Sequence, residues 1–160
     1  PQASRILLKF YKDRIVDTIL AQNQVFGVLS TQERRGLIDA FELKTFGPGQ
    51  EIIREGEVSS QIYIIKTGQA QVIASGSTGP QVLSTIGPGT LFGEVGVLRQ
   101  VPRTAAVHAS LTTDALELEG EFFRNLLKSR PEVSERVEAI ISGRVRANMS
   151  KVLKTGITQL

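Results

Sequence analysis

The spacing of apolar residues divides the chain into three zones, and the first of them is helical. Residues 4–45 carry apolar side chains at the three- and four-residue steps of a helix, for example Val16 and Leu20. Ser30 and Glu33 have the spacing of a capping box, in which a hydroxyl and a carboxylate satisfy free backbone N–H groups where a helix begins. We therefore expect two helices in this zone, the second starting just after Ser30.

The second zone, residues 46–118, alternates short apolar runs with turn residues. The tripeptide Gly47-Pro48-Gly49 recurs as Gly87-Pro88-Gly89, and we interpret both as tight corners that turn the chain into the next strand. Many short strands with frequent turns are typical of an antiparallel barrel or sandwich. The expected strands are Glu51–Arg54, Gln61–Lys66, Gln69–Ala74, Gln81–Ile86, Ala105–His108 and Ala115–Leu118, with a hairpin tip at Ser75–Pro80.

The third zone is helical again from Glu121 onward. Its first helix presents apolar residues at 122, 123, 126 and 127. Pro131 ends that helix and suits the first turn of another, where its missing N–H is not needed. The last helix carries apolar residues from Val133 to Val145 at helical steps, so one of its sides is apolar.

The order of the zones, helices then strands then helices, favours an α+β domain over alternating βαβ units. A chain of 160 residues is the size of one ordinary domain. We divide it into residues 1–45, an N-terminal helical segment or linker; 46–118, the β-barrel; 119–150, two C-terminal helices; and 151–160, a tail. Because the chain starts with Pro1 and nothing there resembles a signal peptide, we expect a piece of a longer protein.

Composition removes several classes of function. The 19 Lys and Arg exceed the 16 Asp and Glu too slightly to mark a nucleic-acid binder. The absence of Cys excludes disulfides and thiol chemistry, and a single histidine, His108, excludes a metal site of several imidazoles. His108 is expected at the surface or the rim. No nucleophile elbow or P-loop pattern is present, and GPGTLFG at 87–93 lacks the G-x-G-x-x-G spacing. We predict a protein that is not an enzyme and holds no metal.

One stretch, FGEVGVLRQVPRTAAV at residues 92–107, has the chemistry of a nucleotide site. A glycine followed by a short helix lets backbone N–H groups face an anion. Arg103 brings a planar fork suited to two phosphate oxygens, and Glu94 can accept hydrogen bonds from a pair of sugar hydroxyls. Ala105 is small enough for a ligand to approach the backbone. Taken singly, Glu94 is also explained as a helix-terminal charge and Arg103 as a strand-edge charge that answers it.

The same stretch resembles the phosphate-binding cassette of cyclic nucleotide-binding domains. FGE-V-G-V-L is followed by Arg-Thr-Ala, with Arg103 nine positions after Glu94. Residues 46–57 and 63–72 also resemble the family, and the likeness covers about residues 25–145. It implies a jelly-roll-like β-barrel, with a cassette at 92–105, flanked by N-terminal helices and by two C-terminal helices, the second of which is a lid over the base.

Carried over residue by residue, the resemblance assigns roles within the cassette. Gly93 offers its backbone to the ligand, Glu94 binds the ribose 2′-hydroxyl, and Arg103 pairs with the cyclic phosphate. Thr104 and Ala105 add a hydroxyl and a backbone donor, and Thr104 leaves both cAMP and cGMP open as the ligand. The complete predicted set is Phe92, Gly93, Glu94, Val95, Arg103, Thr104 and Ala105.

Two positions depart from the family's pattern. Gly96 stands where the family usually has alanine, and because both residues are small we expect little effect. Ser59-Ser60 stands where the family often has Gly-Asp, and we expect this change to affect a turn more than the site.

The resemblance further implies a sensor that passes a helix rearrangement to an attached effector. We expect the regulatory, cytoplasmic domain of a larger bacterial protein, attached to a membrane channel or to a kinase-like effector. An upstream ion channel is the favoured effector, and self-association through the helices is left open. About fifteen residues follow Val145, too few for a helix-turn-helix, so no nucleic-acid binding is expected of this chain. The alternatives are a degenerate domain that serves as an assembly module, or the sensor half of a transcription regulator without its DNA-binding part.

Overall fold

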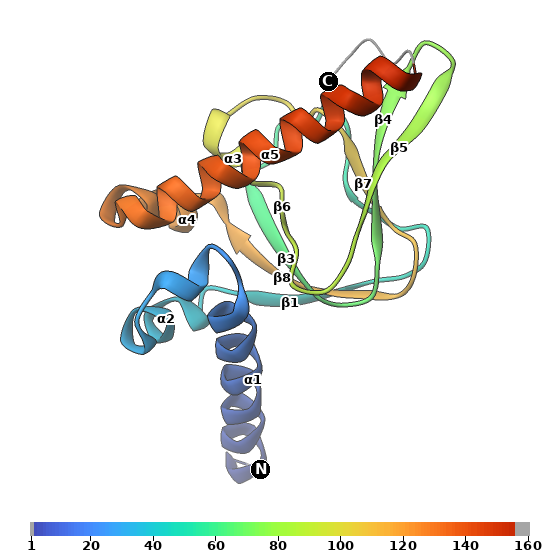
Figure 1. Cartoon of the computed structure of the whole chain (residues 1–160). Coiled ribbons are helices and arrows are strands. Elements are labelled where there is room, and N and C mark those ends of the chain that lie inside the picture. Colours follow the sequence, from blue (N-terminus) through green and yellow to red (C-terminus); the bar gives the residue numbers. More distant parts are fainter. Residues whose placement is uncertain (1, 156–160) are drawn as a thin grey trace.

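Two antiparallel sheets face each other as a jelly-roll-like barrel, and helices lie before and after the strands in the chain (Figure 1). The computed structural model describes residues 2–155, with side chains described for residues 3–144, 146 and 147. The predicted α+β architecture, a barrel flanked by N-terminal and C-terminal helices, is confirmed.

The elements follow one another in the order expected from the three zones. The N-terminal helices are α1 (Gln2–Gln22), the 3-10 helix η1 (Phe26–Val28) and α2 (Thr31–Ile38). The strands are β1 (Glu42–Phe46), β2 (Glu51–Ile53), β3 (Gln61–Thr67), β4 (Ala70–Gly76), β5 (Gly79–Ile86), β6 (Leu91–Phe92), β7 (Ala106–Ala109) and β8 (Thr113–Glu119). The other helices are α3 (Glu94–Arg99), α4 (Gly120–Ser129) and α5 (Pro131–Thr155). One sheet has the order β1-β8-β3-β6 and the other β2-β7-β4-β5.

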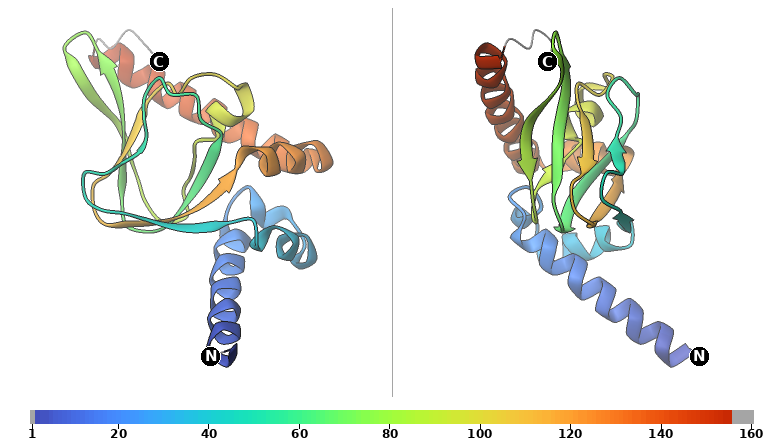
Figure 2. Two further views of the ribbon diagram at one scale, coloured as in Figure 1. Left: turned by 180° about the vertical axis from the view of Figure 1, so that it is seen from behind. Right: turned by 90° about the vertical axis from the view of Figure 1, so that its right-hand side faces the viewer.

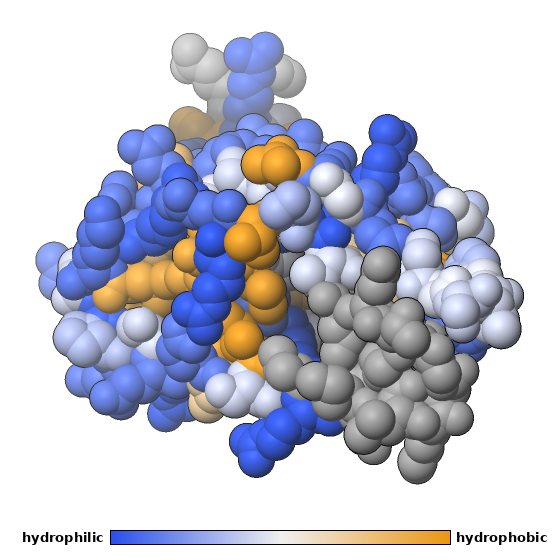
Figure 3. Space-filling model, turned by 90° about the horizontal axis from the view of Figure 1, so that it is seen from above, coloured by the Kyte–Doolittle hydropathy of each residue, from blue (hydrophilic) through white to orange (hydrophobic). Residues whose placement is uncertain are grey.

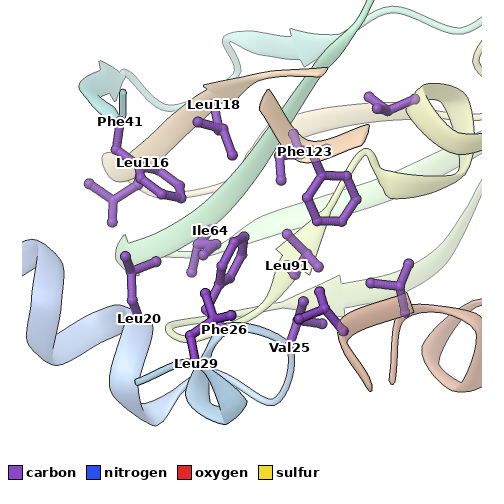
Figure 4. Packing of buried hydrophobic residues seen from close by; sticks show 14 of the residues in the cluster. Leu20, Val25, Phe26, Leu29, Phe41, Ile64, Leu91, Leu116, Leu118 and Phe123 are labelled. Atoms are coloured by element: carbon purple, nitrogen blue, oxygen red, sulfur yellow. The ribbon is translucent and has the colours of Figure 1, made fainter. Parts of the chain in front are cut away.

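Strand β3 is buried on both of its faces, which explains its run of apolar residues. Because successive side chains of a strand point to opposite faces, Ile62 and Ile64 pack against the helices, whereas Tyr63 and Ile65 pack inside the barrel. Figure 4 shows Ile64 among side chains from the helices, including Phe26. The first sheet therefore separates a helix-facing core from the barrel interior.

Helices from both ends of the chain share the helix-facing core. Leu20 of α1, Phe26 of η1, Phe123 of α4 and Val137 of α5 are all fully buried in it. The ring of Phe26 lies 6.1 Å from that of Phe123, centroid to centroid. A displacement of α5 would therefore change the packing of the N-terminal helices directly, because close-packed interiors transmit movement.

The first turns of α1 extend away from the barrel (Figures 1 and 2). Ile6, Leu8 and Phe10 are each more than half exposed there, whereas Val16 and Leu20 further along the helix are buried. The apolar packing of α1 against the domain comes from its second half, while Lys9 of the first half donates to Asp39 at the surface.

The two predicted Gly-Pro-Gly corners are confirmed as tight turns. The N–H of Gln50 donates to the carbonyl of Gly47 at 3.0 Å, and that of Thr90 donates to Gly87 at 3.2 Å. Gly49 and Gly89 have φ of 83° and 86°, which a type II turn requires at its third position.

Some predicted boundaries were wrong. The strand block begins at Glu42 rather than Phe46, because β1 is held by pairing with β8 while four of its five side chains stay exposed, so it shows no apolar alternation. The two-residue β6 is too short for a periodicity. Helix α5 continues beyond residue 150 to Thr155, and the rest of the predicted tail lies outside the described residues. Phe122, expected on the apolar face of its helix, is 51% exposed.

The predicted capping box is confirmed and extends into an ion pair between helices. The N–H of Glu33 donates to Ser30 Oγ at 3.1 Å, and the N–H of Ser30 donates to Glu33 Oε1 at 3.0 Å. The other carboxylate oxygen of Glu33 accepts from Arg130, at the end of α4. Arg130 and then Ser30 lower the pKa of Glu33 to about 2.

We expect Glu33→Gln to destabilise the domain at neutral pH and to have progressively less effect as the pH falls from 4.5 through about 2. A carboxylate whose pKa is lowered on folding stabilises the protein above its ordinary pKa of 4.5, and this contribution is lost as the pH falls towards about 2. Urea unfolding of both proteins across this pH range measures the difference. A difference in the free energy of unfolding that stays constant on acidification would contradict the ion pair.

A second expected change concerns the end of α3. Among the described residues, Gln100 is the one residue other than glycine that has a positive φ, 52°. A side chain is strained in this left-handed region and glycine is not, so Gln100→Gly should stabilise the domain by about 0.5–1 kcal/mol. Thermal unfolding should show a midpoint higher by about 1–4 °C. A lower midpoint would mean that the glutamine side chain stabilises this turn.

Candidate functional site

All seven predicted site residues line one pocket of about 520 Å³. The cassette forms one wall through Phe92 to Gly96 and Pro102 to Ala105, and α5 contributes Arg144 and Ala147. Strands supply the rest of the lining: Ile53, Val72, Ser84, Ile86 and Val107. Apolar side chains gather in the middle of the face that Figure 3 shows from above, with polar side chains at its margins.

Arg103 is buried beside this pocket, only 6% exposed, and its guanidinium is held by three neutral acceptors. Nε donates to Ser59 Oγ at 2.8 Å, Nη1 to the carbonyl of Gly93 at 2.6 Å, and Nη2 to the carbonyl of Gln61 at 2.7 Å. A guanidinium has five N–H donors, so two of them, one on each terminal nitrogen, remain beyond these three bonds. Two parallel N–H groups match two oxygens of a phosphate.

The backbone of Arg103 is held by the loop between β2 and β3. Its N–H donates to the carbonyl of Glu57 at 2.9 Å, and its carbonyl accepts from the N–H of Gly56 at 2.8 Å. The same loop supplies Ser59 to the side chain. Arg103 is therefore positioned by a segment more than forty residues away in the sequence.

The charge of Arg103 has no carboxylate partner within ion-pair distance among the described residues. Burial is the main influence on its pKa and lowers it, while the more distant charges of Glu57 and Glu94 act in the opposite direction. Because a guanidinium stays protonated in proteins, the site holds a buried positive charge that an anion in the pocket would compensate.

Glu94, the first residue of α3, is the buried acidic group of the pocket, at 1% exposure. Its Oε1 accepts a hydrogen bond from Arg144 of α5, which also donates to the carbonyl of Leu91. A second pair joins the same two helices, because Arg99 donates to Glu138 through two bonds of 3.1 and 2.8 Å. Two ion pairs therefore hold α5 against the cassette.

A family model for the cyclic nucleotide-binding domain matches residues 43–130, more than half of the chain. The chain belongs to the cyclic nucleotide-binding domain family. This domain is 35% identical over 125 residues to the cAMP-dependent protein kinase regulatory subunit of Debaryomyces hansenii, and the match covers 77% of this chain but only 27% of that protein.

Two further relatives illustrate the range of the family. The CRP-like cAMP-activated global transcriptional regulator of Mycobacterium tuberculosis is 27% identical over 132 residues, covering 82% of this chain and 59% of that protein. The co-crystal structure of the regulatory domain of Toxoplasma gondii PKA with cAMP has a TM-score of 0.67 and 27% identity, covering 71% of this chain and 43% of that chain. These relatives are named for regulation, and they give no support to the expected ion-channel effector.

The structure contradicts the expectation about Ser59 and gives the surroundings of Gly96. Ser59 is bonded to the side chain of Arg103 and so belongs to the site rather than to a turn alone. A Cβ on Gly96 would lie 2.7 Å from Nη1 of Arg103, so an alanine here would require the Arg103 side chain to shift.

Arg144 is the charged residue of the pocket lining that was not predicted from the sequence. The resemblance implied that the last helix is a lid, and its spacing predicted one apolar side. Val133, Val137 and Ile141 are buried as expected, while the side chain of Val145 lies outside the described residues. Arg144 follows Ile141 by three residues on this helix, which puts it on the same side. That spacing is the signal that could have identified it.

His108, expected at the surface or rim, is half-buried, and its Nε2 lies 2.9 Å from Glu51 Oε2. Among residues whose side chains are described, no three or more His, Asp or Glu groups are gathered as they would be around a metal ion. Within residues 2–155, none of the helices has the length and apolar character of a membrane span.

Proposed function

We propose that this domain binds cAMP in the pocket and passes the binding event to an effector through its helices. The observation that carries the proposal is the buried guanidinium of Arg103, which has two N–H donors beyond its three bonds and no carboxylate partner among the described residues. An arginine placed in this way is suited to bind an anionic ligand. Membership of the cyclic nucleotide-binding domain family indicates that this ligand is a cyclic nucleotide.

Each part of a cyclic nucleotide has a matching part of the pocket. The phosphate, with one negative charge, binds the free N–H donors of Arg103 and neutralises its buried charge. The ribose 2′-hydroxyl donates to the carboxylate of Glu94, which has lone pairs beyond the one that Arg144 uses. The purine lies against the apolar lining, which includes Val72 and Ile86.

The relatives support cAMP as the first ligand to test. Both curated relatives described above carry cAMP in their names, and the Toxoplasma gondii domain was solved with cAMP. Thr104, through which the family resemblance leaves cGMP open, lines the pocket with an exposed side chain. We therefore keep cGMP as the alternative ligand.

Helix α5 connects the pocket to the core that the N-terminal helices share. It meets the ligand site through Arg144 and the shared core through Val137. A ligand that favours one position of α5 shifts the population of the domain towards that position, and the N-terminal helices follow because they share the core. The effector that reads this change is a regulated partner or attached module, in keeping with relatives that are named as regulators.

A thermal-shift series tests the proposal. Saturating cAMP should raise the unfolding midpoint by several degrees and in proportion to the logarithm of its concentration, because only the folded state binds. Adenosine, which lacks the phosphate, and 2′-deoxy-cAMP, which lacks the partner of Glu94, should give smaller shifts at equal concentration. A midpoint that neither cAMP nor cGMP moves at millimolar concentration would indicate a degenerate domain.

A further inference from the structure

Two residues beside the Arg103 side chain, Ser59 and Gly96, bear on where its guanidinium lies. Of its three acceptors, Ser59 Oγ alone belongs to a side chain, since Gly93 and Gln61 contribute backbone carbonyls. The hydroxyl of Ser59 is therefore the acceptor that a substitution can remove without disturbing the backbone.

Gly96 leaves the space that the guanidinium occupies. A Cβ there would lie 2.7 Å from Nη1, 2.9 Å from Cδ and 3.1 Å from Cζ of Arg103. The backbone of Gly96 itself is helical and needs no glycine for its conformation, since it lies inside α3 and has no positive φ. Alanine is also the better helix former, so the glycine is explained by the arginine beside it rather than by the helix.

We propose that Ser59 and Gly96 are positioning residues that hold Arg103 in the pose in which it binds phosphate. Ser59 orients the Nε edge of the guanidinium, and Gly96 lets it lie against α3. Arginine has many rotamers, and fixing one of them before the ligand arrives reduces the loss of freedom on binding. The inference rests on the proposed function, because it assumes that Arg103 binds the ligand's phosphate.

The structure supplies matched controls for both positions. Ser60 adjoins Ser59, and no hydrogen bond of its hydroxyl is part of the Arg103 network. Gly143 is also a helical glycine, but a Cβ there would have no neighbouring atom within 4 Å. Ser60→Ala and Gly143→Ala thus repeat the chemical changes without touching Arg103.

Calorimetric titration with cAMP tests the inference. Ser59→Ala should weaken binding about tenfold, the lower end of what one hydrogen bond to a charged group contributes, and Ser59→Thr should restore it by keeping the hydroxyl. Gly96→Ala should weaken binding about 10- to 100-fold, because a displaced binding group misaligns with the ligand, while the unfolding midpoint stays the same or rises. Both control variants should bind as the unmodified domain does.

A spectroscopic measurement separates positioning from general damage. The Nε–H resonance of Arg103, identified by its loss in Arg103→Leu, should move in Ser59→Ala and return in Ser59→Thr. Normal binding by both Ser59→Ala and Gly96→Ala would overturn the inference and leave the proposed function intact. Equal losses in the control variants would also overturn it. No binding by the unmodified domain would overturn the proposed function and the inference together.

Discussion

Arg103→Leu should remove cAMP binding from a domain that stays folded. The substitution deletes both free N–H donors and the buried positive charge that the phosphate neutralises. Two charge-assisted hydrogen bonds contribute about 3–6 kcal/mol together, so the affinity should fall by a factor of at least about 100. Titration calorimetry measures the loss, and circular dichroism shows whether the fold persists.

Arg54→Leu is the matched control, because it makes the same change in charge and shape on a neighbouring, exposed residue. Arg54 donates to Glu51 at the surface and does not line the pocket. The Arg54→Leu variant should bind cAMP with an affinity within about twofold of that of the unmodified domain, since exposed ion pairs contribute little. Undiminished binding by Arg103→Leu would show that the phosphate, if it binds, lies elsewhere.

Arg144→Ala should lower the stability of the unliganded domain. The change leaves the carboxylate of Glu94, 1% exposed, without the cation that now donates to it. Breaking a buried ion pair costs about 3–5 kcal/mol, and because the Arg144 side chain is 35% exposed we expect a smaller loss of about 1–3 kcal/mol. Urea unfolding at neutral pH measures this difference.

The control for Arg144→Ala is Arg146→Ala. Arg146 is exposed, and its bond is a long one of 3.4 Å to Ser142 of its own helix. Its removal should change the free energy of unfolding by less than about 0.5 kcal/mol. Equal effects of the two substitutions would mean that the pair between Arg144 and Glu94 does not hold α5 to the cassette.

The fold could be predicted because its core pattern is local and repeated. The buried run of β3 and the Gly-Pro-Gly corners both follow from the chemistry of single residues. The capping box of Ser30 and Glu33 is likewise a matter of spacing along the chain. Strand β1 escaped detection because its stability comes from pairing with β8, which no periodicity records.

The two charges of the site could be predicted, and helical spacing could have placed Arg144 on the pocket side of its helix. The pairing of each charge with its partner could not be predicted. Glu94 and Arg103 lie in one short motif of recognisable chemistry and line one pocket. Ser59 and Arg144 reach them from a loop and a helix distant in sequence, and only the fold brings these together. Gly96 shows the same limit, because its importance depends on where the Arg103 side chain lies.

The most direct test of the account is a calorimetric titration of the unmodified domain with cAMP, followed by one with cGMP. We predict saturable binding of one nucleotide per chain, with the ratio of the two dissociation constants identifying the preferred base. No heat from either nucleotide, in a protein that circular dichroism shows to be folded, would contradict the account. Glu94 and Arg103 would then be structural charges of an assembly module.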